Sequence, residues 1–325
     1  MKTPIITIEN LQKYYPAKKK SFQERQYVKA VDDVSFCVYK GETFGIVGES
    51  GCGKSTLCKS IIRLIEPTGG RVIFQGVDIN QLKKEEMRLL RKHMQIIFQD
   101  PYASLNPRMT VRELIKAPLD IFTDDSEEEK MKTVINMMRL VGLNEEFIQK
   151  YPHEFSGGQR QRIVIARALI INPEFVCCDE PVSALDVSVR AQVLNLMQEV
   201  QRKLNLTYLF ISHDLSVVRY LCDRVAVMYL GKIVEIATKD ELYNNPLHPY
   251  TKCLLASIPV PDPEKVRSHS PLEGDVPSPY NPPAGCYFHT RCPCVQANCS
   301  LTYPSLIEVS EGHFVACHLC HTKEV

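Results

Sequence analysis

The stretch GESGCGKST, residues 48–56, decides how the rest of this 325-residue sequence is interpreted. It fits the pattern G-x-x-x-x-G-K-S/T, with Gly48, Gly53, Lys54 and Ser55 at the fixed positions. The stretch lies between the apolar run FGIVG and a run with helical spacing, which is the strand-then-helix setting that the pattern requires. In that setting main-chain N–H groups surround phosphate oxygens, and the positive N-terminal end of the helix adds to the attraction. Residues 48–56 therefore predict a phosphate-binding loop (P-loop).

The loop positions have separate expected roles. Lys54 is expected to pair with the β- and γ-phosphates, and the Ser55 hydroxyl is expected to ligate Mg²⁺. Cys52 fills a variable position of the pattern as a small side chain. The residues predicted here to bind ATP are Gly48, Ser50, Gly51, Cys52, Gly53, Lys54, Ser55 and Thr56.

A pair of carboxylates follows a second apolar run, FVCCDE, at residues 175–180. Asp179 is placed to hold Mg²⁺ through water, and Glu180 is placed to polarise the attacking water. An apolar run that ends in Asp-Glu is a weak signal by itself, because many strands end in acidic residues. Together with the P-loop it predicts an enzyme that hydrolyses ATP to ADP and phosphate.

The segment FSGGQRQR, residues 155–162, predicts a helix that begins after a serine and two glycines. Such a helix start can offer N–H groups and a hydroxyl to a phosphate. This segment resembles the signature motif of ATP-binding cassette (ABC) proteins, and the other motifs of that family follow in register over residues 4 to about 240. The signature positions are Ser156, Gly157, Gly158 and Gln159.

The resemblance implies further roles for single residues. Gln99, in IIFQDP, matches the Q-loop glutamine, which takes part in catalysis and in Mg²⁺ binding. His213, in FISHD, matches the switch histidine that contacts the γ-phosphate, and Asp186, in SALD, matches the D-loop. Tyr15 matches the aromatic residue that stacks on adenine, although the adjacent Tyr14 competes for that assignment.

The family resemblance also implies a head-to-tail pair of cassettes, in which the signature of one completes the nucleotide site of the other. This chain carries one cassette, so it is expected to pair with itself or with a paralogue. Its signature residues would then serve the nucleotide of the partner.

Three other stretches resemble ATPase subunits of oligopeptide or dipeptide importers, most closely the subunit usually designated F. They are QDPYASLNPRMTVRELI, NNPLHPYTKCLLASIP and the tail pattern P-P-x-G-C-x-F-x-x-R-C-P. This resemblance implies a peripheral subunit at the cytoplasmic face of the cell membrane. Its expected partners are a paralogous ATPase subunit, two transmembrane permease subunits and an extracytoplasmic substrate-binding protein. Import of nickel chelates or oligosaccharides remains an alternative.

Composition disfavours a further alternative, a soluble ABC ATPase associated with nucleic acid. The 39 basic and 38 acidic residues give a net charge of +1, so no overall field would recruit nucleic acid. The sequence contains no run of 18 apolar residues and no signal peptide at its beginning, which predicts a cytosolic protein without a membrane span.

The alternation of expected strands and helices predicts an α/β fold of the ABC type of P-loop NTPase. We expect a nucleotide-binding domain over residues 1–240, with an antiparallel β subdomain and an inserted, mainly helical subdomain at about 101–170. RVIFQGVDI, residues 71–79, is expected to be one strand, and Ser126 with Glu129 predicts a capping box. A C-terminal extension over residues 241–325 would contain a linker with eight prolines in residues 259–283, followed by a cysteine-rich end.

Six of the 13 cysteines lie after residue 285. Thiols stay reduced in the cytosol, so these cysteines do not predict disulfides. Three alternatives are open: unpaired thiols, a zinc site that uses close pairs such as Cys317 and Cys320, or a 4Fe–4S cluster. The resemblance to peptide-importer ATPases favours the cluster, with Cys286, Cys292, Cys299 and Cys317 as ligands.

Overall fold

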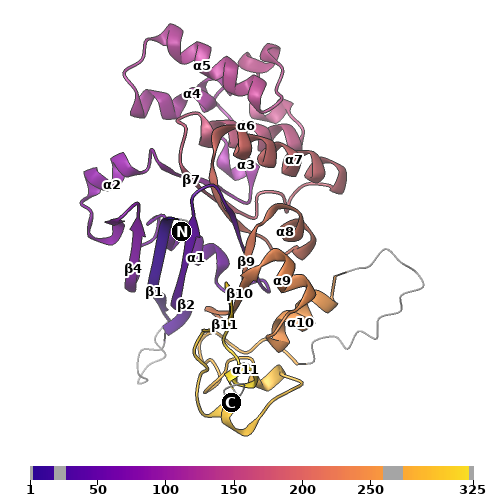
Figure 1. Cartoon of the computed structure of the whole chain (residues 1–325). Coiled ribbons are helices and arrows are strands. Elements are labelled where there is room, and N and C mark those ends of the chain that lie inside the picture. Colours follow the sequence, from indigo (N-terminus) through magenta and orange to yellow (C-terminus); the bar gives the residue numbers. More distant parts are fainter. Residues whose placement is uncertain (1–2, 18–26, 259–273, 322–325) are drawn as a thin grey trace. The chain divides into compact units, whose positions relative to one another are not determined.

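The computed structural model describes residues 3–17, 27–258 and 274–321 (Figure 1). Much of the predicted proline-rich linker, residues 259–273, lies outside the described residues. The chain divides into two compact units. The helical unit comprises Met1–Ile5, Val38–Thr43 and Gln81–Ile211, and the P-loop unit comprises Ile6–Cys37, Phe44–Asn80 and Ser212–Val325. In the described ranges, no helix has both the length and the apolar content needed to cross a membrane.

Parallel strands form the sheet of the helical unit. They are β6 (Met94–Ile97), β7 (Phe175–Asp179) and β8 (Thr207–Ile211), and β7 pairs with both of the others. Every residue of β7 and β8 is buried, which explains why both strands are continuous apolar runs in the sequence.

Helices make up most of the rest of this unit, as the sequence predicts for residues 101–170 (Figure 1). The α-helices are α2 (Lys84–Leu90), α3 (Pro101–Ser104), α4 (Val111–Phe122), α5 (Glu127–Leu140), α6 (Gly157–Leu169) and α7 (Val187–Leu204). Two 3-10 turns, η2 (Glu145–Gln149) and η3 (Pro152–Glu154), lie between α5 and α6. Helix α4 packs against both α5 and α6.

Side-chain caps fix where these helices begin. The predicted capping box of Ser126 and Glu129 is confirmed at the start of α5, and Thr110 with Glu113 forms the same arrangement at α4. In each box a hydroxyl accepts from a first-turn N–H group, and a glutamate accepts from the N-cap N–H group. The sequence therefore sets both helix starts locally.

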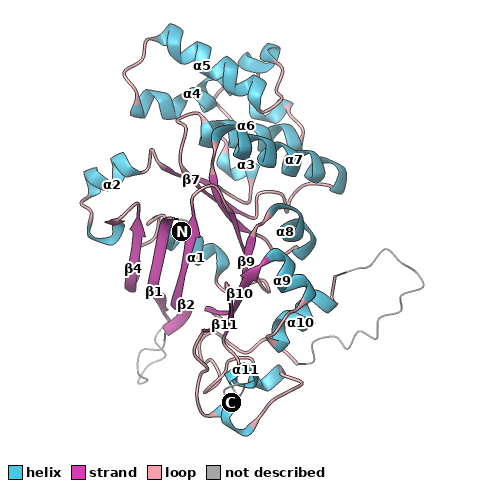
Figure 2. Cartoon of the chain, viewed as in Figure 1, coloured by secondary structure: helices cyan, strands magenta, loops and turns pink. Residues whose placement is uncertain are grey.

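Two sheets form the framework of the P-loop unit (Figure 2). The first has the order β2-β1-β4-β5. Its strands are β1 (Pro4–Pro16), β2 (Tyr27–Tyr39), β4 (Gly69–Phe74) and β5 (Val77–Asp78). The predicted single strand over residues 71–79 is wrong, because Gln75 and Gly76 adopt positive φ angles of 48° and 83° and turn the chain into the antiparallel hairpin of β4 and β5.

The strands of the second sheet that belong to this unit follow the order β11-β12-β10-β9-β3. Its strands are β3 (Thr43–Val47), β9 (Arg224–Tyr229), β10 (Lys232–Thr238), β11 (Ile307–Ser310) and β12 (His313–Val315). Strands β3 and β9 run parallel, and the other pairs are antiparallel. Residues near the C-terminus thus extend a sheet that begins beside the P-loop.

Helices and short turns complete the P-loop unit. The α-helices are α1 (Lys54–Ile61), α8 (Leu215–Leu221), α9 (Lys239–Asn244), α10 (Pro249–Ala256) and α11 (His318–His321). The 3-10 turns are η1 (Ile79–Gln81), η4 (His289–Arg291) and η5 (Ala297–Ser300).

A buried contact between His313 and Glu235 links the C-terminal strands to β10. His313 Nε2 lies 2.8 Å from Glu235 Oε1, and both side chains are almost fully buried. Glu235 also accepts from the N–H groups of Leu247 and His248. Burial alone would raise the pKa of Glu235, but these hydrogen bonds together lower it, so the carboxylate stays ionised.

Candidate nucleotide-binding site

The P-loop connects the end of β3 to the beginning of α1, as the sequence predicts. Gly53 is the N-cap of α1 and has a left-handed φ of 109°. A Cβ atom there would lie 2.0 Å from the main-chain oxygen of Ala30, so only glycine fits. No side chain caps α1, which leaves the capping of its first turn to other partners. Such a helix start suits an anion.

Lys54 is folded back over the loop that precedes it. Its side chain is buried, and Nζ donates to the carbonyl oxygens of Gly48 at 2.8 Å and Glu49 at 3.0 Å. Cys52 is buried as well, and burial raises the pKa of its thiol. The thiol is thus kept neutral as a packing group, while Lys54 brings a cation to the centre of the loop.

The two candidate tyrosines on β1 have different surroundings. The Tyr14 hydroxyl donates to Asp32, which also accepts from Tyr287 at 2.9 Å and pairs with Lys232 at 3.3 Å. Burial of its carboxyl opposes ionisation, but the Tyr14 hydrogen bond, Lys232 and Tyr287 together lower the pKa of Asp32. The Tyr15 side chain is 38% exposed. Of the two rings, Tyr15 is therefore better placed to stack on a base.

The predicted acidic pair lies at the end of β7 in the helical unit. Asp179 is buried, and Glu180 follows it with a positive φ of 48°. A left-handed glutamate costs about 1 kcal/mol or more, and such strain is typical of functional positions. Gln99 Nε2 donates to Glu180 Oε2 at 3.1 Å, so the structure brings these two predicted catalytic residues together.

The signature residues form the start of α6. Ser156 Oγ accepts from the Gln159 N–H group at 3.4 Å, and Gln159 Oε1 accepts from the Ser156 N–H group at 3.1 Å. A Cβ atom on Gly158 would lie 2.3 Å from Cγ1 of Val189 in α7, which explains the need for glycine at this position. The helix begins where the sequence predicts, at the serine and the two glycines.

Two more predicted residues stand at element ends. Asp186 is the N-cap of α7 and accepts from Val189 N at 3.0 Å and Ser188 Oγ at 2.8 Å. The hydrogen bond from Val189 N, with the one from Ser188, lowers the pKa of this exposed carboxyl. His213 lies two residues after the end of β8 and is exposed. The P-loop, Tyr15 and His213 belong to the P-loop unit, whereas Gln99, Asp179, Glu180 and the signature belong to the helical unit.

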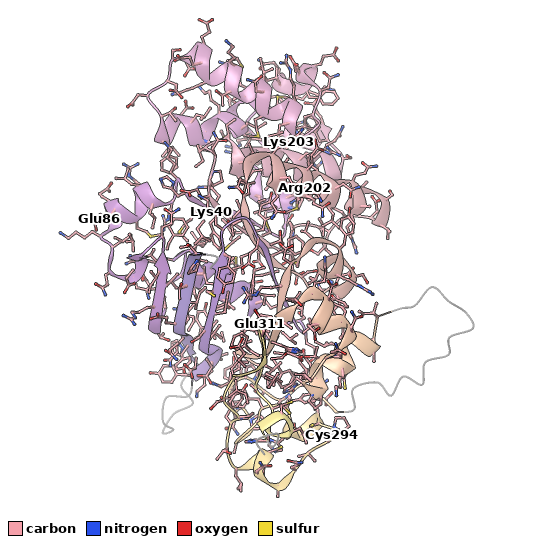
Figure 3. The ribbon with its side chains drawn as sticks, viewed as in Figure 1. Lys40, Glu86, Arg202, Lys203, Cys294 and Glu311 are labelled. Atoms are coloured by element: carbon pink, nitrogen blue, oxygen red, sulfur yellow. The ribbon has the colours of Figure 1, made fainter. Side chains whose placement is uncertain are left out.

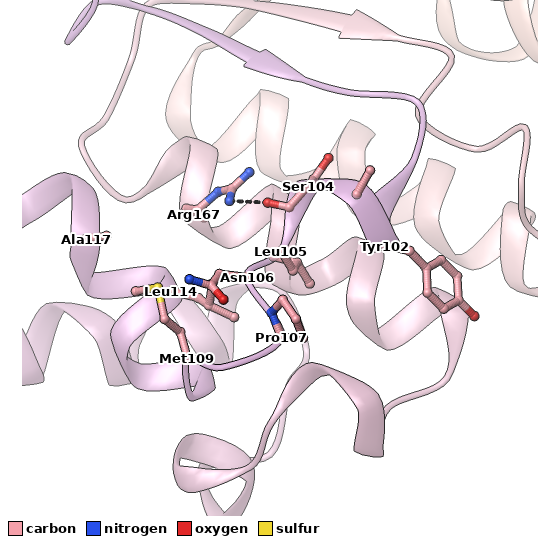
Figure 4. A pocket seen from close by; sticks show the side chains of 10 residues that line it. Tyr102, Ser104, Leu105, Asn106, Pro107, Met109, Leu114, Ala117 and Arg167 are labelled. Atoms are coloured by element: carbon pink, nitrogen blue, oxygen red, sulfur yellow. Dashed lines mark hydrogen bonds between the residues drawn. The ribbon is translucent and has the colours of Figure 1, made fainter.

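A pocket of about 600 Å³ opens in the helical unit just after Gln99 (Figure 4). Its wall follows the chain from Tyr102 to Met109 and is closed by residues of α4 and by Arg167. Arg167 Nη1 donates to the Ser104 carbonyl oxygen at 2.5 Å, which fixes the turn that forms one wall. The guanidinium of Arg160, in α6, stacks 4.0 Å from the centre of the Tyr102 ring. The pocket is therefore linked to the signature helix.

The tail cysteines converge on a different place, in the P-loop unit. Cys286, Cys292, Cys299 and Cys317 all line one cavity of about 10 Å³, together with Cys294. Cys294, which Figure 3 labels, is exposed, and Cys320 lines another pocket. Burial, with smaller contributions from neighbouring thiols, raises the pKa of Cys292 to about 11 and that of Cys317 to about 12.

This cysteine arrangement is not a preformed metal site. In the described part of the chain, no group of three or more His, Cys, Asp or Glu side chains could hold a metal ion as placed. The four thiols predicted to bind a cluster share a cavity no larger than one water molecule. Their donor chemistry suits an iron–sulfur cluster, whereas their present spacing does not enclose one.

The structure also shows a contact that sequence reasoning missed. Glu49, inside the P-loop, forms an ion pair with Arg291 of η4, and its N–H group donates to the Tyr250 hydroxyl at 3.0 Å. More than 200 residues separate the partners in the sequence, so no local pattern could predict these contacts. The only sequence signal was the arginine in the tail pattern.

Two family models match the chain. "ABC transporter" matches residues 31–183, and "Oligopeptide/dipeptide transporter, C-terminal region" matches residues 234–299. Among curated proteins, the "Oligopeptide transport ATP-binding protein AppF" of Bacillus subtilis is 54% identical over 97% of both chains. The "Putative oligopeptide transport ATP-binding protein YkfD" of the same organism is 51% identical over 99% of this chain and 97% of its own length.

Solved structures give the same fold. The dimeric ATP-binding cassette MJ0796 bound to ADP and Pi matches with a TM-score of 0.64 and 29% identity, over 72% of this chain and 98% of that chain. CbiO1 from Clostridium perfringens, part of the ABC transporter complex cbiONQ, matches with a TM-score of 0.65 and 27% identity. The match covers 74% of this chain and 91% of that chain. The chain therefore belongs to the ABC transporter family of ATP-hydrolysing cassettes, in the branch that carries the oligopeptide/dipeptide transporter C-terminal region.

Proposed function

We propose that this chain is the ATPase subunit that powers import of oligopeptides or dipeptides through a membrane ABC transporter. The observation that carries the proposal is the combination of one cassette with the peptide-transporter C-terminal region, at about half identity to oligopeptide transport proteins over nearly the whole chain. A subunit of this kind works as a peripheral protein at the cytoplasmic face of the membrane. A substrate-binding protein outside the membrane would deliver the peptide.

ATP hydrolysis is assigned to residues of both units. The P-loop residues Gly48 and Ser50 to Thr56 hold the phosphates, with Lys54 on the β- and γ-phosphates, and Tyr15 stacks on adenine. Hard oxygen donors suit Mg²⁺, and the Ser55 hydroxyl, the Asp179 carboxylate and the Gln99 amide oxygen supply them. With bound Mg²⁺, charge on the phosphates is neutralised.

Activation of the attacking water is assigned to Glu180. Its carboxylate accepts a hydrogen bond from Gln99, which supports a role for Gln99 in orienting it. His213, at the end of β8, contacts the γ-phosphate in this proposal. Loss of a general base typically lowers a rate by about 10²- to 10⁴-fold, so Glu180 is the residue on which turnover depends most.

A paralogous cassette completes each nucleotide site in the proposal. Ser156, Gly157, Gly158 and Gln159 would face the phosphates bound by the partner, and Asp186 would lie at the dimer interface. The N-terminal turn of α6, a helix of 13 residues, supplies N–H groups that suit an anion.

Two permease subunits form the pathway, and we assign their contact to the pocket after Gln99. The pocket lies in the same unit as Gln99 and Glu180, and Arg160 joins its Tyr102 wall to the signature helix. A permease segment bound in this pocket would be coupled to both the Q-loop and the signature helix. Closure of the cassettes on ATP would then move the permease, and hydrolysis would reset it.

The cysteine-rich end of the extension, residues 241–325, is assigned a 4Fe–4S cluster held by Cys286, Cys292, Cys299 and Cys317, with zinc as the alternative. The four thiols line one cavity, which is the observation that supports a common ligand, and this cavity would have to open for a cluster to bind. When bound, the cluster would join four points of the tail by iron–thiolate bonds. Anaerobic purification followed by iron, sulfide and zinc analysis tests this assignment. A folded tail without any metal would contradict it.

Copurification tests the proposed function itself. The tagged chain is extracted from membranes in mild detergent, and its partners are identified by mass spectrometry. We expect two hydrophobic permease subunits and a second cassette. Nucleic acid or ribosomal proteins in their place would contradict the proposal. A permease complex that binds nickel chelates or oligosaccharides would favour the alternative substrates over peptides.

A further inference from the structure

Glu49 presents an electrostatic problem. It is the second residue of the P-loop, directly between Gly48 and Ser50. A loop that binds the phosphates of ATP gains from N–H groups and cations, whereas a carboxylate inside it repels the same phosphates. Its negative charge must therefore be neutralised, or directed away, if the loop is to bind ATP well.

Arg291, in the cysteine-rich tail, binds this carboxylate through both terminal nitrogens of its guanidinium. Arg291 Nη1 lies 2.9 Å from Glu49 Oε2, and Nη2 lies 3.1 Å from Glu49 Oε1. This is a bidentate pair, which fixes direction as well as charge. The Arg291 side chain is 5% exposed and that of Glu49 is 24% exposed, so water screens the pair only weakly.

Aromatic packing holds Arg291 in place. Phe288, three residues earlier, is fully buried against Tyr229, Tyr250 and His248. The Tyr229 hydroxyl accepts a further hydrogen bond from Arg291 Nη1 at 3.4 Å. The position of the guanidinium beside the P-loop is therefore fixed by its neighbours.

The same aromatic group reaches the main chain of the loop. The Glu49 N–H group donates to the hydroxyl of Tyr250, and the Glu49 carbonyl oxygen accepts from Lys54. Burial raises the pKa of the Tyr250 hydroxyl, so it stays protonated and uncharged. Glu49 is thus held by its amide, its carbonyl and its carboxylate, and two of these three contacts come from residues far along the chain.

We propose that Arg291 is a positioning residue for ATP binding, which neutralises Glu49 and holds the first turn of the P-loop in its phosphate-binding shape. The tail thereby sets the ATP affinity of its own cassette. A purely structural contact would not need a buried ion pair, since apolar residues of similar volume stabilise a fold as well or better. The proposal does not depend on what the neighbouring cysteines bind.

The test compares Arg291→Met, Glu49→Gln and the double variant in the full-length chain. Affinity is measured with a fluorescent N-methylanthraniloyl ATP in the presence of Mg²⁺, and thermal unfolding is followed in parallel. Arg291→Met should weaken binding about tenfold, because it leaves the carboxylate unpaired beside the phosphates. Glu49→Gln should stay within about twofold of the unchanged chain. The double variant should recover to the same range, which a general loss of packing would not allow.

Arg71→Met is the matched control, because Arg71 pairs with Glu9 on the four-stranded sheet of the same unit. Its affinity should match that of the unchanged chain. An Arg291→Met chain that is folded and binds within twofold would overturn the proposal, and so would a double variant as weak as Arg291→Met. If Arg291→Met does not fold, Arg291→Lys takes its place: the single ammonium should bind ATP about threefold more weakly, with recovery on adding Glu49→Gln. Unchanged affinity in Arg291→Lys would then overturn it.

Discussion

The P-loop and the signature segment are both helix starts that are assigned to phosphates, yet they are held in opposite ways. The signature segment supports itself, because Ser156 and Gln159 cap α6 with their own side chains. The P-loop has no side-chain cap and depends on Ala30, Tyr250 and residues of the tail. The signature motif therefore contains the residues that hold its own helix start. The P-loop motif supplies the residues of the loop, but distant parts of the chain hold that loop in its conformation.

The largest effect is expected outside both helix starts, at Glu180. Glu180→Gln keeps the size of the side chain but removes the charge that polarises water, so ATP turnover should fall about 10³-fold. ATP affinity should change little. Phosphate release and nucleotide binding, measured on the same preparation, separate these effects. Turnover at the original rate would remove Glu180 from the role of base.

Lys54→Ala is expected to have the next largest effect, and it acts on binding. Lys54 Nζ donates to two carbonyl oxygens of the loop. The change removes the cation that is assigned to the β- and γ-phosphates, so ATP affinity should fall about 100-fold. Equilibrium nucleotide binding measures this. Unaltered affinity would count against the P-loop assignment.

Gly158→Ala tests how closely the start of α6 packs against α7. The new methyl group would clash with Val189 and should destabilise the fold by about 1–3 kcal/mol. The higher helix propensity of alanine offsets part of this loss. Because the obstacle is a side chain, Val189→Ala should restore most of the stability. Chemical unfolding of the single and double variants checks this. Failure of the second change to compensate would show that the contact is not the cause.

Ser156→Ala is expected to have the smallest effect on stability, about 1 kcal/mol, through loss of the N-cap. Ser126→Ala is a matched control, because Ser126 caps α5 by the same arrangement with Glu129. Both variants should lose similar stability, but only Ser156→Ala should also slow ATP turnover of the assembled transporter. Equal turnover in the two variants would mean that Ser156 acts only as a cap.

Sequence reasoning predicted what depends on near neighbours. The capping box at Ser126, the start of α6 at Ser156 and the apolar strand that ends at Asp179 are all confirmed. Buried strands and capped helices follow from residue spacing over a few positions, which a single sequence displays. The hydrogen bond of Gln99 with Glu180 joins two motifs that were predicted separately.

Long-range contacts could not be predicted in this way. Nothing near Glu49 shows that Arg291 pairs with it, and nothing near β10 shows that His313 and its strand extend the sheet. The sequence assigned adenine stacking to Tyr15 with Tyr14 as a competitor, and the hydrogen bond of Tyr14 to Asp32 favours Tyr15. The hairpin at Gln75 was missed because a turn of two residues hardly interrupts an apolar pattern.

Peptide uptake by the reconstituted transporter is the decisive measurement for the proposed function. The complex that copurifies with the chain is reconstituted into liposomes that enclose ATP, and labelled peptide is supplied outside with the substrate-binding protein. We expect uptake that requires enclosed ATP and that is lost in the Glu180→Gln complex. Absence of peptide uptake by a complex that hydrolyses ATP, or equal uptake with Glu180→Gln, would contradict it.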